Sequence, residues 1–288
     1  MDEEPNWQFY MLVALADGER IAAWDAEKGG AEYLCPVCQR SVVLKKGDHV
    51  VHHFAHKRFD GCNLGTGETH EHMLSKYIVA KELRRRNKQC DVEFPLDDGG
   101  VRRRADVVVL NARHTPVAVI EIQHTNISEA ELLGRMSDYK KLCVHQLWCV
   151  LYDRKKFARY ERERVDGGYL YKKISVPPYW GVIRNFYCDK LFFLDPVQSE
   201  IYFGTVLPHY LWMPHREWHD EYGEECSSGG FEYQSERWRN LEMRGPYPIK
   251  DVHFVPRRIS AVASIYSNLQ DWGLLFLQAN NQDIKVPQ

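Results

Sequence analysis

The chain has 288 residues, a formal net charge of −2 and a hydrophobic content of 44%. This content supports a packed core, and the nearly balanced charge excludes a uniformly basic nucleic-acid-binding protein. Any contact with nucleic acid must therefore come from local patches of lysine or arginine.

The N-terminus lacks the basic and then apolar pattern of a secretory signal peptide, and no apolar run is long enough to span a bilayer. These patterns predict a cytoplasmic protein with no membrane partner. Its eight cysteines are then expected to be reduced, so closely spaced cysteines indicate a metal site rather than a disulfide.

Residues 1–66 are expected to form a small β-rich domain. Residues 8–15 predict a strand, Asp17 and Gly18 a tight turn, and residues 20–24 the returning strand. Further along, residues 42–48 predict another hairpin.

This first domain also carries residue types that bind metal. Three thiolates and one imidazole make a tetrahedral zinc site. We predict a structural Zn²⁺ held by Cys35, Cys38, His56 and Cys62, with His53 as the alternative imidazole. Buried thiols beside an exposed pair of histidines are the alternative interpretation.

Residues 68–83 predict a helix, with Thr66 or Thr69 as its N-cap. On one side of this helix an acid, an imidazole and an amine follow one another at i, i+4 spacing. They are Glu68, His72 and Lys76. The stripe is compatible with part of a catalytic site, but by itself it favours a solvated ladder of charges.

Two β-branched runs, residues 105–110 and 117–125, flank a turn and predict a hairpin. Asp106 starts the first strand and Glu121 interrupts the apolar centre of the second, with Gln123 on the same face as Glu121. Buried carboxylates are costly to desolvate, and a metal ion would offset that cost. Two solvated carboxylates at a strand end are the alternative.

A short strand at 92–96 precedes this hairpin, and a helix follows it, with Ser128 and Glu131 as a capping box. Residues 146–152 predict another buried strand. The order helix, three strands, helix, strand predicts an α/β layer with a mixed sheet. Two basic clusters are candidate phosphate contacts: Arg84, Arg85, Arg86, Arg102, Arg103 and Arg104.

As a set, these motifs resemble the competence protein CoiA-like family within the PD-(D/E)xK nuclease superfamily. The resemblance covers roughly residues 9–152. It rests on the Cys-Pro-x-Cys and His-Phe-Ala-His motifs, on Glu68 with His72 and Lys76, on Arg104 to Val107, on Glu121-Ile122-Gln123, and on Arg135 with Tyr139. Two positions differ from the superfamily pattern: Gln123 stands where Lys is usual, and Arg104-Ala105 replaces the usual Pro before the Asp.

The resemblance implies a restriction-endonuclease-like αβββαβ core in residues 67–155, followed by an α+β accessory domain in residues 156–288. It implies a hydrolase that cuts DNA with Mg²⁺ or Mn²⁺ held by Asp106, Glu121 and Glu68. The other catalytic residues that it implies are His72, Lys76, Gln123, Arg135 and Tyr139.

The expected substrate is foreign or incoming DNA, single- or double-stranded, in competence and recombination or in defence against phage. Recombination or defence proteins are the expected partners. One alternative is a non-catalytic DNA-binding module that assists recombination and keeps the nuclease-like fold. Another is a zinc-dependent adaptor without affinity for nucleic acid.

The last third of the chain predicts strands near residues 186–195 and 200–204. Trp212, Trp218 and Trp238 are expected in a core or an interface rather than as platforms for bases. The tail beyond Asn280 is expected to be disordered.

Overall fold

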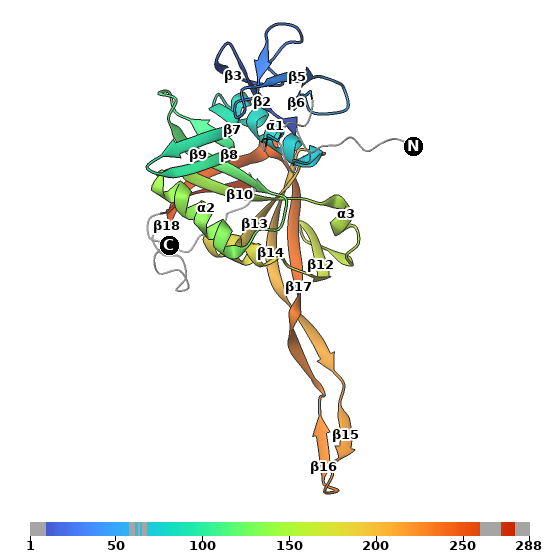
Figure 1. Cartoon of the computed structure of the whole chain (residues 1–288). Helices are drawn as coiled ribbons and strands as arrows, with labels where there is room; N and C mark the ends of the chain where they lie inside the picture. Colours follow the sequence, from blue (N-terminus) through green and yellow to red (C-terminus); the bar gives the residue numbers. More distant parts are fainter. Residues whose placement is uncertain (1–9, 58–60, 63, 65–67, 260–271, 280–288) are drawn as a thin grey trace.

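The computed structural model describes residues 10–57, 61–62, 64, 68–259 and 272–279. The described chain forms a small sheet, a large mixed sheet and a long hairpin that projects from the large sheet (Figure 1). The predicted linker at 65–67, the candidate cap Thr66 and the tail beyond Asn280 lie outside the described residues.

The small sheet has the strand order β1-β6-β5-β4-β2-β3. Its strands are β1 (Tyr10–Met11), β2 (Val13–Ala16), β3 (Glu19–Ala22), β4 (Tyr33–Leu34), β5 (Ser41–Lys45) and β6 (His53–His56). The single strand predicted at 8–15 is broken at Leu12 into β1 and β2. Asp17 and Gly18 make the predicted turn, with positive φ angles of 51° and 84°.

The next six elements follow the predicted order of helix, three strands, helix and strand. They are α1 (His70–Arg85), β7 (Gln89–Asp98), β8 (Val101–Leu110), β9 (Pro116–Gln123), α2 (Glu129–Lys141) and β10 (His145–Leu151). Strands β7, β8 and β9 are antiparallel neighbours, whereas β10 pairs with β9 in parallel. The prediction of a mixed α/β sheet is therefore confirmed.

The remaining elements extend this sheet in the order β11-β12-β17-β14-β13-β10-β9-β8-β7, and β19 joins β10 and β18. They are α3 (Arg154–Phe157), β11 (Arg162–Val165), β12 (Gly168–Ile174), α4 (Pro178–Phe186), β13 (Lys190–Asp195), β14 (Glu200–Met213), β15 (Arg216–His219), β16 (Glu225–Ser228), β17 (Phe231–Pro248), β18 (Val252–Ile259) and β19 (Trp272–Ala279), with a 3₁₀ turn at Ile249–Asp251. The sheet is continuous across residue 155, and the division into three domains stays a prediction.

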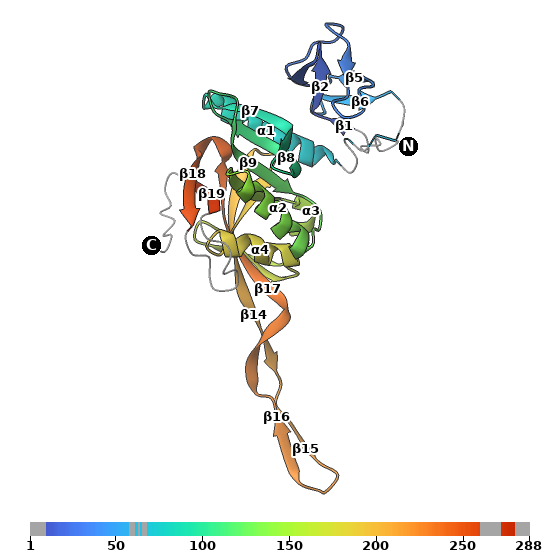
Figure 2. The same ribbon diagram turned by 60° about the vertical axis from the view of Figure 1, so that its left-hand side comes forward.

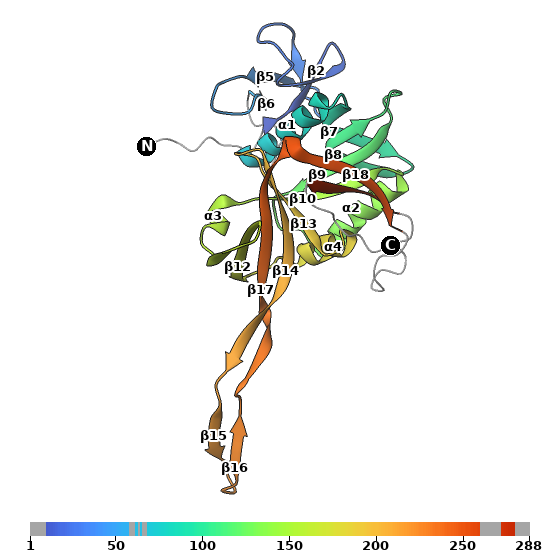
Figure 3. The same cartoon turned by 180° about the vertical axis from the view of Figure 1, so that it is seen from behind.

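Residues 209–239, which we call the arm, project away from the rest of the molecule (Figures 1 and 3). Strands β14 and β17 stay paired out to Met213 opposite Phe231, and β15 pairs with β16 at the tip. Trp212 is 61% exposed and Trp218 is 48% exposed. Neither side chain lies in a core, because the arm is a two-stranded ribbon and no other described element pairs with it beyond Met213 and Phe231. Their place in an interface stays a prediction.

Helix α1 lies between the small sheet and the large sheet (Figure 2). On one side its Tyr77 ring lies 5.1 Å from the ring of Trp24, and Arg84 pairs with Asp25 at 2.7 Å. On its other side α1 packs on β7 and β8. Within the part of the chain that the structure describes, no helix has the length and apolar character to cross a membrane.

Candidate functional site

The acid, imidazole and amine that the sequence placed in one stripe lie at the start of α1: Glu68 directly precedes the N-cap residue, and His72 and Lys76 lie in the helix. Thr69 caps the helix, because its side chain accepts a hydrogen bond from the His72 amide at 3.2 Å. One carboxylate oxygen of Glu68 lies 2.7 Å from His72 Nδ1, and the other accepts from Lys76 Nζ at 2.7 Å. Exposure is 7% for Glu68, 4% for His72 and 1% for Lys76. The alternative of a solvated ladder is therefore wrong.

The β8–β9 hairpin brings Asp106 to this stripe. Pairing of Val107 with Ile120 sets Asp106 beside Glu121, and Asp106 Oδ2 accepts a hydrogen bond from the Ile122 amide at 2.9 Å. The same oxygen lies 3.2 Å from His72 Nε2, and Asp106 Oδ1 lies 3.4 Å from Lys76 Nζ. Two motifs that are separate in the sequence thus meet at one carboxylate.

Helix α2 supplies partners for the second carboxylate. Glu121 is 1% exposed, and its two oxygens accept hydrogen bonds from Arg135 and from the Tyr139 hydroxyl. Arg135 and Tyr139 are four residues apart and therefore share one helix face. Ser128 caps this helix by accepting from the Glu131 amide at 3.1 Å, as the capping box predicted.

Two residues at the site escaped the sequence analysis. Glu93 in β7 is 5% exposed and has a φ of 49°. Its Oε1 accepts from Lys76 Nζ at 3.3 Å and its Oε2 accepts from the Leu12 amide at 3.1 Å. His124, at the end of β9, stacks on His72 with 4.0 Å between ring centroids. An acid within the apolar strand 92–96 was the available signal for Glu93, whereas the sequence carries no comparable signal for His124.

Opposite charges decide most of the protonation states in this cluster. Burial opposes ionisation of Glu68, but Lys76 and His72 outweigh it and lower the pKa of this carboxyl to about 2. Burial and Lys76 lower the pKa of His72, but Asp106 and Glu68 outweigh them and raise it to about 9. Burial likewise opposes the charge of Asp106, yet His72 and Lys76 hold the pKa of Asp106 well below its ordinary value.

Glu121 differs from the other acids. Burial raises its pKa to about 7, although Arg135 lowers it, and the charge on Asp106 adds to the increase. Around neutral pH the cluster therefore contains ionised Glu68 and Asp106 beside a protonated His72. A phosphodiester group has only acceptor oxygens, so the donors for it in this cluster are His72 and Lys76, whereas the carboxylates attract cations.

The donor chemistry of Asp106, Glu121 and Glu68 fits Mg²⁺, which prefers carboxylate oxygens. Each of these oxygens accepts a hydrogen bond from, or forms an ion pair with, a neighbouring group. An entering divalent cation would thus compete with Lys76 and His72 for the same oxygens. The side-chain amide of Gln123 donates to the Thr125 carbonyl at 2.7 Å.

The two arginine clusters have different surroundings. Arg84 pairs with Asp25, and Arg85 and Arg86 both bind Glu82. In the second cluster, Arg104 is exposed beside a hollow of about 400 Å³ that Arg135 also lines. Its neighbours Arg102 and Arg103 line the same hollow and pair with Asp97 and Asp138. The second cluster, Arg102 to Arg104, therefore lies next to the site. The first cluster, Arg84 to Arg86, makes contacts within the chain instead.

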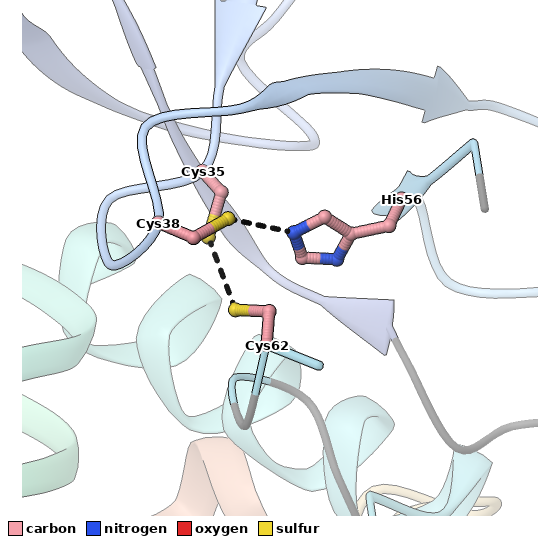
Figure 4. Close-up of side chains that lie close together, drawn as sticks. All are labelled: Cys35, Cys38, His56 and Cys62. Atoms are coloured by element: carbon pink, nitrogen blue, oxygen red, sulfur yellow. Dashed lines mark hydrogen bonds between the residues drawn. The ribbon is translucent and has the colours of Figure 1, made fainter. Parts of the chain in front are cut away.

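The predicted zinc ligands converge in the small sheet (Figure 4). The ligand atoms of Cys35, Cys38, His56 and Cys62 all lie within 4.8 Å of one another. Cys35 Sγ lies 3.8 Å from Cys62 Sγ, and Cys38 Sγ lies 3.3 Å from His56 Nε2. Tetrahedral zinc with bonds of about 2.3 Å sets sulfur atoms about 3.8 Å apart. This cluster can therefore bind zinc.

The alternative ligand His53 lies outside the cluster. It is buried, and its Nδ1 lies 2.8 Å from the Val51 carbonyl. Its ring packs against the ring of Tyr10 in a tilted arrangement, with 4.4 Å between centroids. Of the two histidines, His56 is thus the one that the structure brings to the thiols.

Two family models match the chain. The model described as competence protein CoiA, N-terminal domain, matches residues 16–65, and the model described as competence protein CoiA, nuclease-like domain, matches residues 68–178. Neither the curated proteins nor the solved structures give a match. The two matches agree with the resemblance that the motifs indicated.

Proposed function

The chain belongs to the CoiA-like competence protein family, and from this premise we propose that it is a metal-dependent DNA nuclease. The observation that carries the proposal is the convergence of Glu68, His72 and Lys76 on Asp106, beside Glu121 with its two partners from α2. The expected substrate is incoming or foreign DNA in competence and recombination, or in defence against phage. The protein would work in the cytoplasm.

The residues that would hold Mg²⁺ or Mn²⁺ are Asp106, Glu121 and Glu68. When bound, such an ion would activate water and stabilise the negative charge that develops on the scissile phosphate. The chain's own donors, His72, Lys76 and Arg135, would hold phosphate oxygens. Gln123 would orient the attacking water, and Tyr139 would fix the position of Glu121.

Contacts that bring DNA to the site would come from the arginine side chains beside it. Arg104 has an exposed guanidinium and lines the same hollow as Arg135, so it supports this role best. Arg102 and Arg103 line the hollow as well. Arg84, Arg85 and Arg86 stay candidates for outer phosphate contacts, although intramolecular partners hold them.

The proposed core is restriction-endonuclease-like and corresponds to residues 67–155. The zinc-binding N-terminal domain would be residues 1–66, and the α+β accessory domain would be residues 156–288. The element order from α1 to β10 supports the proposed core, and the large sheet continues past residue 155 into the accessory region. The match of the nuclease-like family model extends further, to residue 178.

A specific observation favours a second candidate function. Lys76, His72 and Arg135 already neutralise the carboxylates that a metal would need, and Gln123 stands where the superfamily usually has Lys. A non-catalytic DNA-binding module that assists recombination would need no metal at this position. Its site would bind a phosphate group without cutting the strand.

A cleavage assay separates the two candidates. Wild type is incubated with single-stranded, duplex and nicked DNA in Mg²⁺ or Mn²⁺, beside Asp106→Asn, Glu121→Gln and the matched exposed control Glu217→Gln. The nuclease proposal expects at least a hundredfold loss in the first two variants and no change in the control, because metal charge supplies several kcal/mol of barrier reduction. If wild type binds DNA but cuts none of these substrates, the nuclease proposal fails and the non-catalytic DNA-binding module is the function that remains.

A further inference from the structure

Four lysines surround one hollow of about 740 Å³ on the small sheet. They come from three different segments: Lys28 from the loop before β4, Lys45 and Lys46 from the end of β5, and Lys57 from the residue after β6. The acidic side chain that shares the lining is Glu32. Positive charge therefore gathers on one concave surface of a chain whose net charge is −2.

These lysines have no carboxylate partner, unlike Arg102 and Arg103 beside the nuclease-like site. Within the described part of the chain, none of the four forms an ion pair. Lys28 Nζ donates to the Lys46 carbonyl at 3.0 Å and Lys46 Nζ donates to the Trp24 carbonyl at 3.5 Å, so both ammonium groups have neutral acceptors. Like charges that converge without a counter-charge repel one another, so a bound polyanion would be stabilised here.

The floor of the hollow is aromatic. Tyr10 and His53 line it with rings whose centroids are 4.4 Å apart and whose planes are tilted by 46°. Burial lowers the pKa of His53, and the charge on Lys45 lowers it further. The buried His53 ring therefore adds no charge, and the half-buried Tyr10 ring is the one that a base can reach. Lysines at the rim with rings at the floor are the combination that binds single strands, because phosphates meet cations and unpaired bases stack on rings.

We propose that this hollow, which we call the lysine groove, binds single-stranded DNA. Its volume exceeds what a lone inorganic anion fills and lies within the range of sites that enclose organic ligands. This inference rests on the proposed function. It adds that the N-terminal zinc-binding domain would bind the single strand that the nuclease-like site then acts on. The groove residues are distinct from those placed at the nuclease-like site.

The test measures binding of a fluorescein-labelled DNA single strand by the full-length protein over a series of salt concentrations. The variant is Lys45→Gln with Lys57→Gln, because both side chains are exposed and neither makes a hydrogen bond or ion pair among the described residues. The matched control is Lys155→Gln with Lys250→Gln, which removes the same charge from exposed positions elsewhere. We expect at least tenfold weaker binding in the first double variant, and a salt slope smaller by about 1.4, since each of the two phosphate contacts contributes about 0.7.

A third variant tests the ring floor. Tyr10→Leu keeps apolar bulk but removes the ring, so it should weaken single-strand binding about fivefold without changing the salt slope, and should leave duplex binding unaltered. Equal weakening in the groove and control variants would overturn the proposal, as would unchanged binding in the groove variants. Single-stranded RNA that binds more than tenfold tighter than DNA would overturn DNA as the ligand.

Cleavage measured on the same preparations separates this inference from the proposed function. If binding depends on Lys45 and Lys57 but no substrate is cut, the proposal of a nuclease is contradicted and the proposal of the lysine groove stands. If the groove variants bind and cut DNA as wild type does, the proposal of the lysine groove is contradicted and the proposal of a nuclease stands. Wild type that binds no single strand at low salt overturns the groove whatever its cleavage activity.

Discussion

Two polar clusters in this molecule stabilise buried groups in opposite ways. Around Asp106, acids and bases from α1, β7, β8 and β9 neutralise one another through hydrogen bonds and ion pairs. The Cys/His cluster contains no cation of its own, and burial raises the pKa of the Cys35 thiol to about 12. A thiolate there needs a metal ion, whereas Glu68 and Asp106 in the other cluster are ionised without one.

This difference teaches what each cluster contributes to folding. The Cys/His cluster can bind zinc, and the binding energy of a structural zinc ion would contribute directly to folding of the small sheet. The Asp106 cluster depends on residues from many segments, so breaking any one contact leaves an uncompensated buried charge. The Leu12 amide, which donates to Glu93, connects the two regions.

The largest effect should follow from zinc removal. Cys35→Ser, or a chelator at neutral pH, should unfold the small sheet, because structural zinc contributes on the order of 10 kcal/mol in small modules. Hydrogen exchange by mass spectrometry would show rapid exchange in β1 to β6 and slower exchange in β8 to β10. Metal analysis of reduced wild type should find about one zinc per chain. A zinc content near zero would contradict the assignment.

A smaller effect is expected where the compensating charge is internal. Lys76→Met leaves three acids, Glu68, Glu93 and Asp106, without their shared cation. We expect a loss of about 3–5 kcal/mol in the free energy of unfolding, measured by urea titration. The control Lys81→Met removes an exposed lysine from the same helix and should change stability by less than about 0.5 kcal/mol. Equal effects in the two variants would argue against a compensated cluster.

The pH dependence of stability should show the same compensation. The pKa of His72 is raised to about 9, so its contribution is complete below about pH 6.5 and is lost as pH rises through 9. The pKa of Glu68 is lowered to about 2, so its contribution is complete above about pH 4.5 and is lost as pH falls through 2. His72→Gln should remove about 3 kcal/mol of the change in stability between pH 6.5 and 9. Identical pH profiles for variant and wild type would contradict the ion pairs.

The smallest effect concerns the cap that starts α1. Thr69→Ala removes the acceptor for the His72 amide and should lower the free energy of unfolding by about 1 kcal/mol. Thr69→Ser keeps the hydroxyl and should restore most of the loss. Thermal unfolding of both variants would measure the difference. A loss in the Ser variant as large as in the Ala variant would show that the hydroxyl does not cap this helix.

The sequence predicted those features that depend on local spacing. Cys-x-x-Cys, the i, i+4 stripe of α1, the capping box at Ser128 and the β8–β9 hairpin all follow from nearby residues. Glu93 could not be assigned in this way, because its role depends on a positive φ and on Leu12, which lies 81 residues earlier. The stacking of His124 on His72 likewise arises from tertiary packing.

The arm was the main architectural feature that the sequence did not reveal. Its aromatic side chains suggested burial, since Trp and Tyr usually lie in cores or interfaces, and a strand was predicted only to residue 204. In the structure β14 continues to Met213, and seven large hydrophobic side chains of the arm are exposed. Hydrophobic pattern alone does not distinguish a strand under a second layer from one that leaves the body.

The arm has a consequence for how the molecule behaves in solution. A compact chain of this length has a radius of gyration of about 19 Å, whereas strands rising about 3.3 Å per residue carry the tip near Asp220 up to about 40 Å beyond Pro208. A single chain with this outline diffuses more slowly than its mass suggests. It should elute from a gel-filtration column with larger compact proteins, so its oligomeric state has to be measured by light scattering or sedimentation equilibrium.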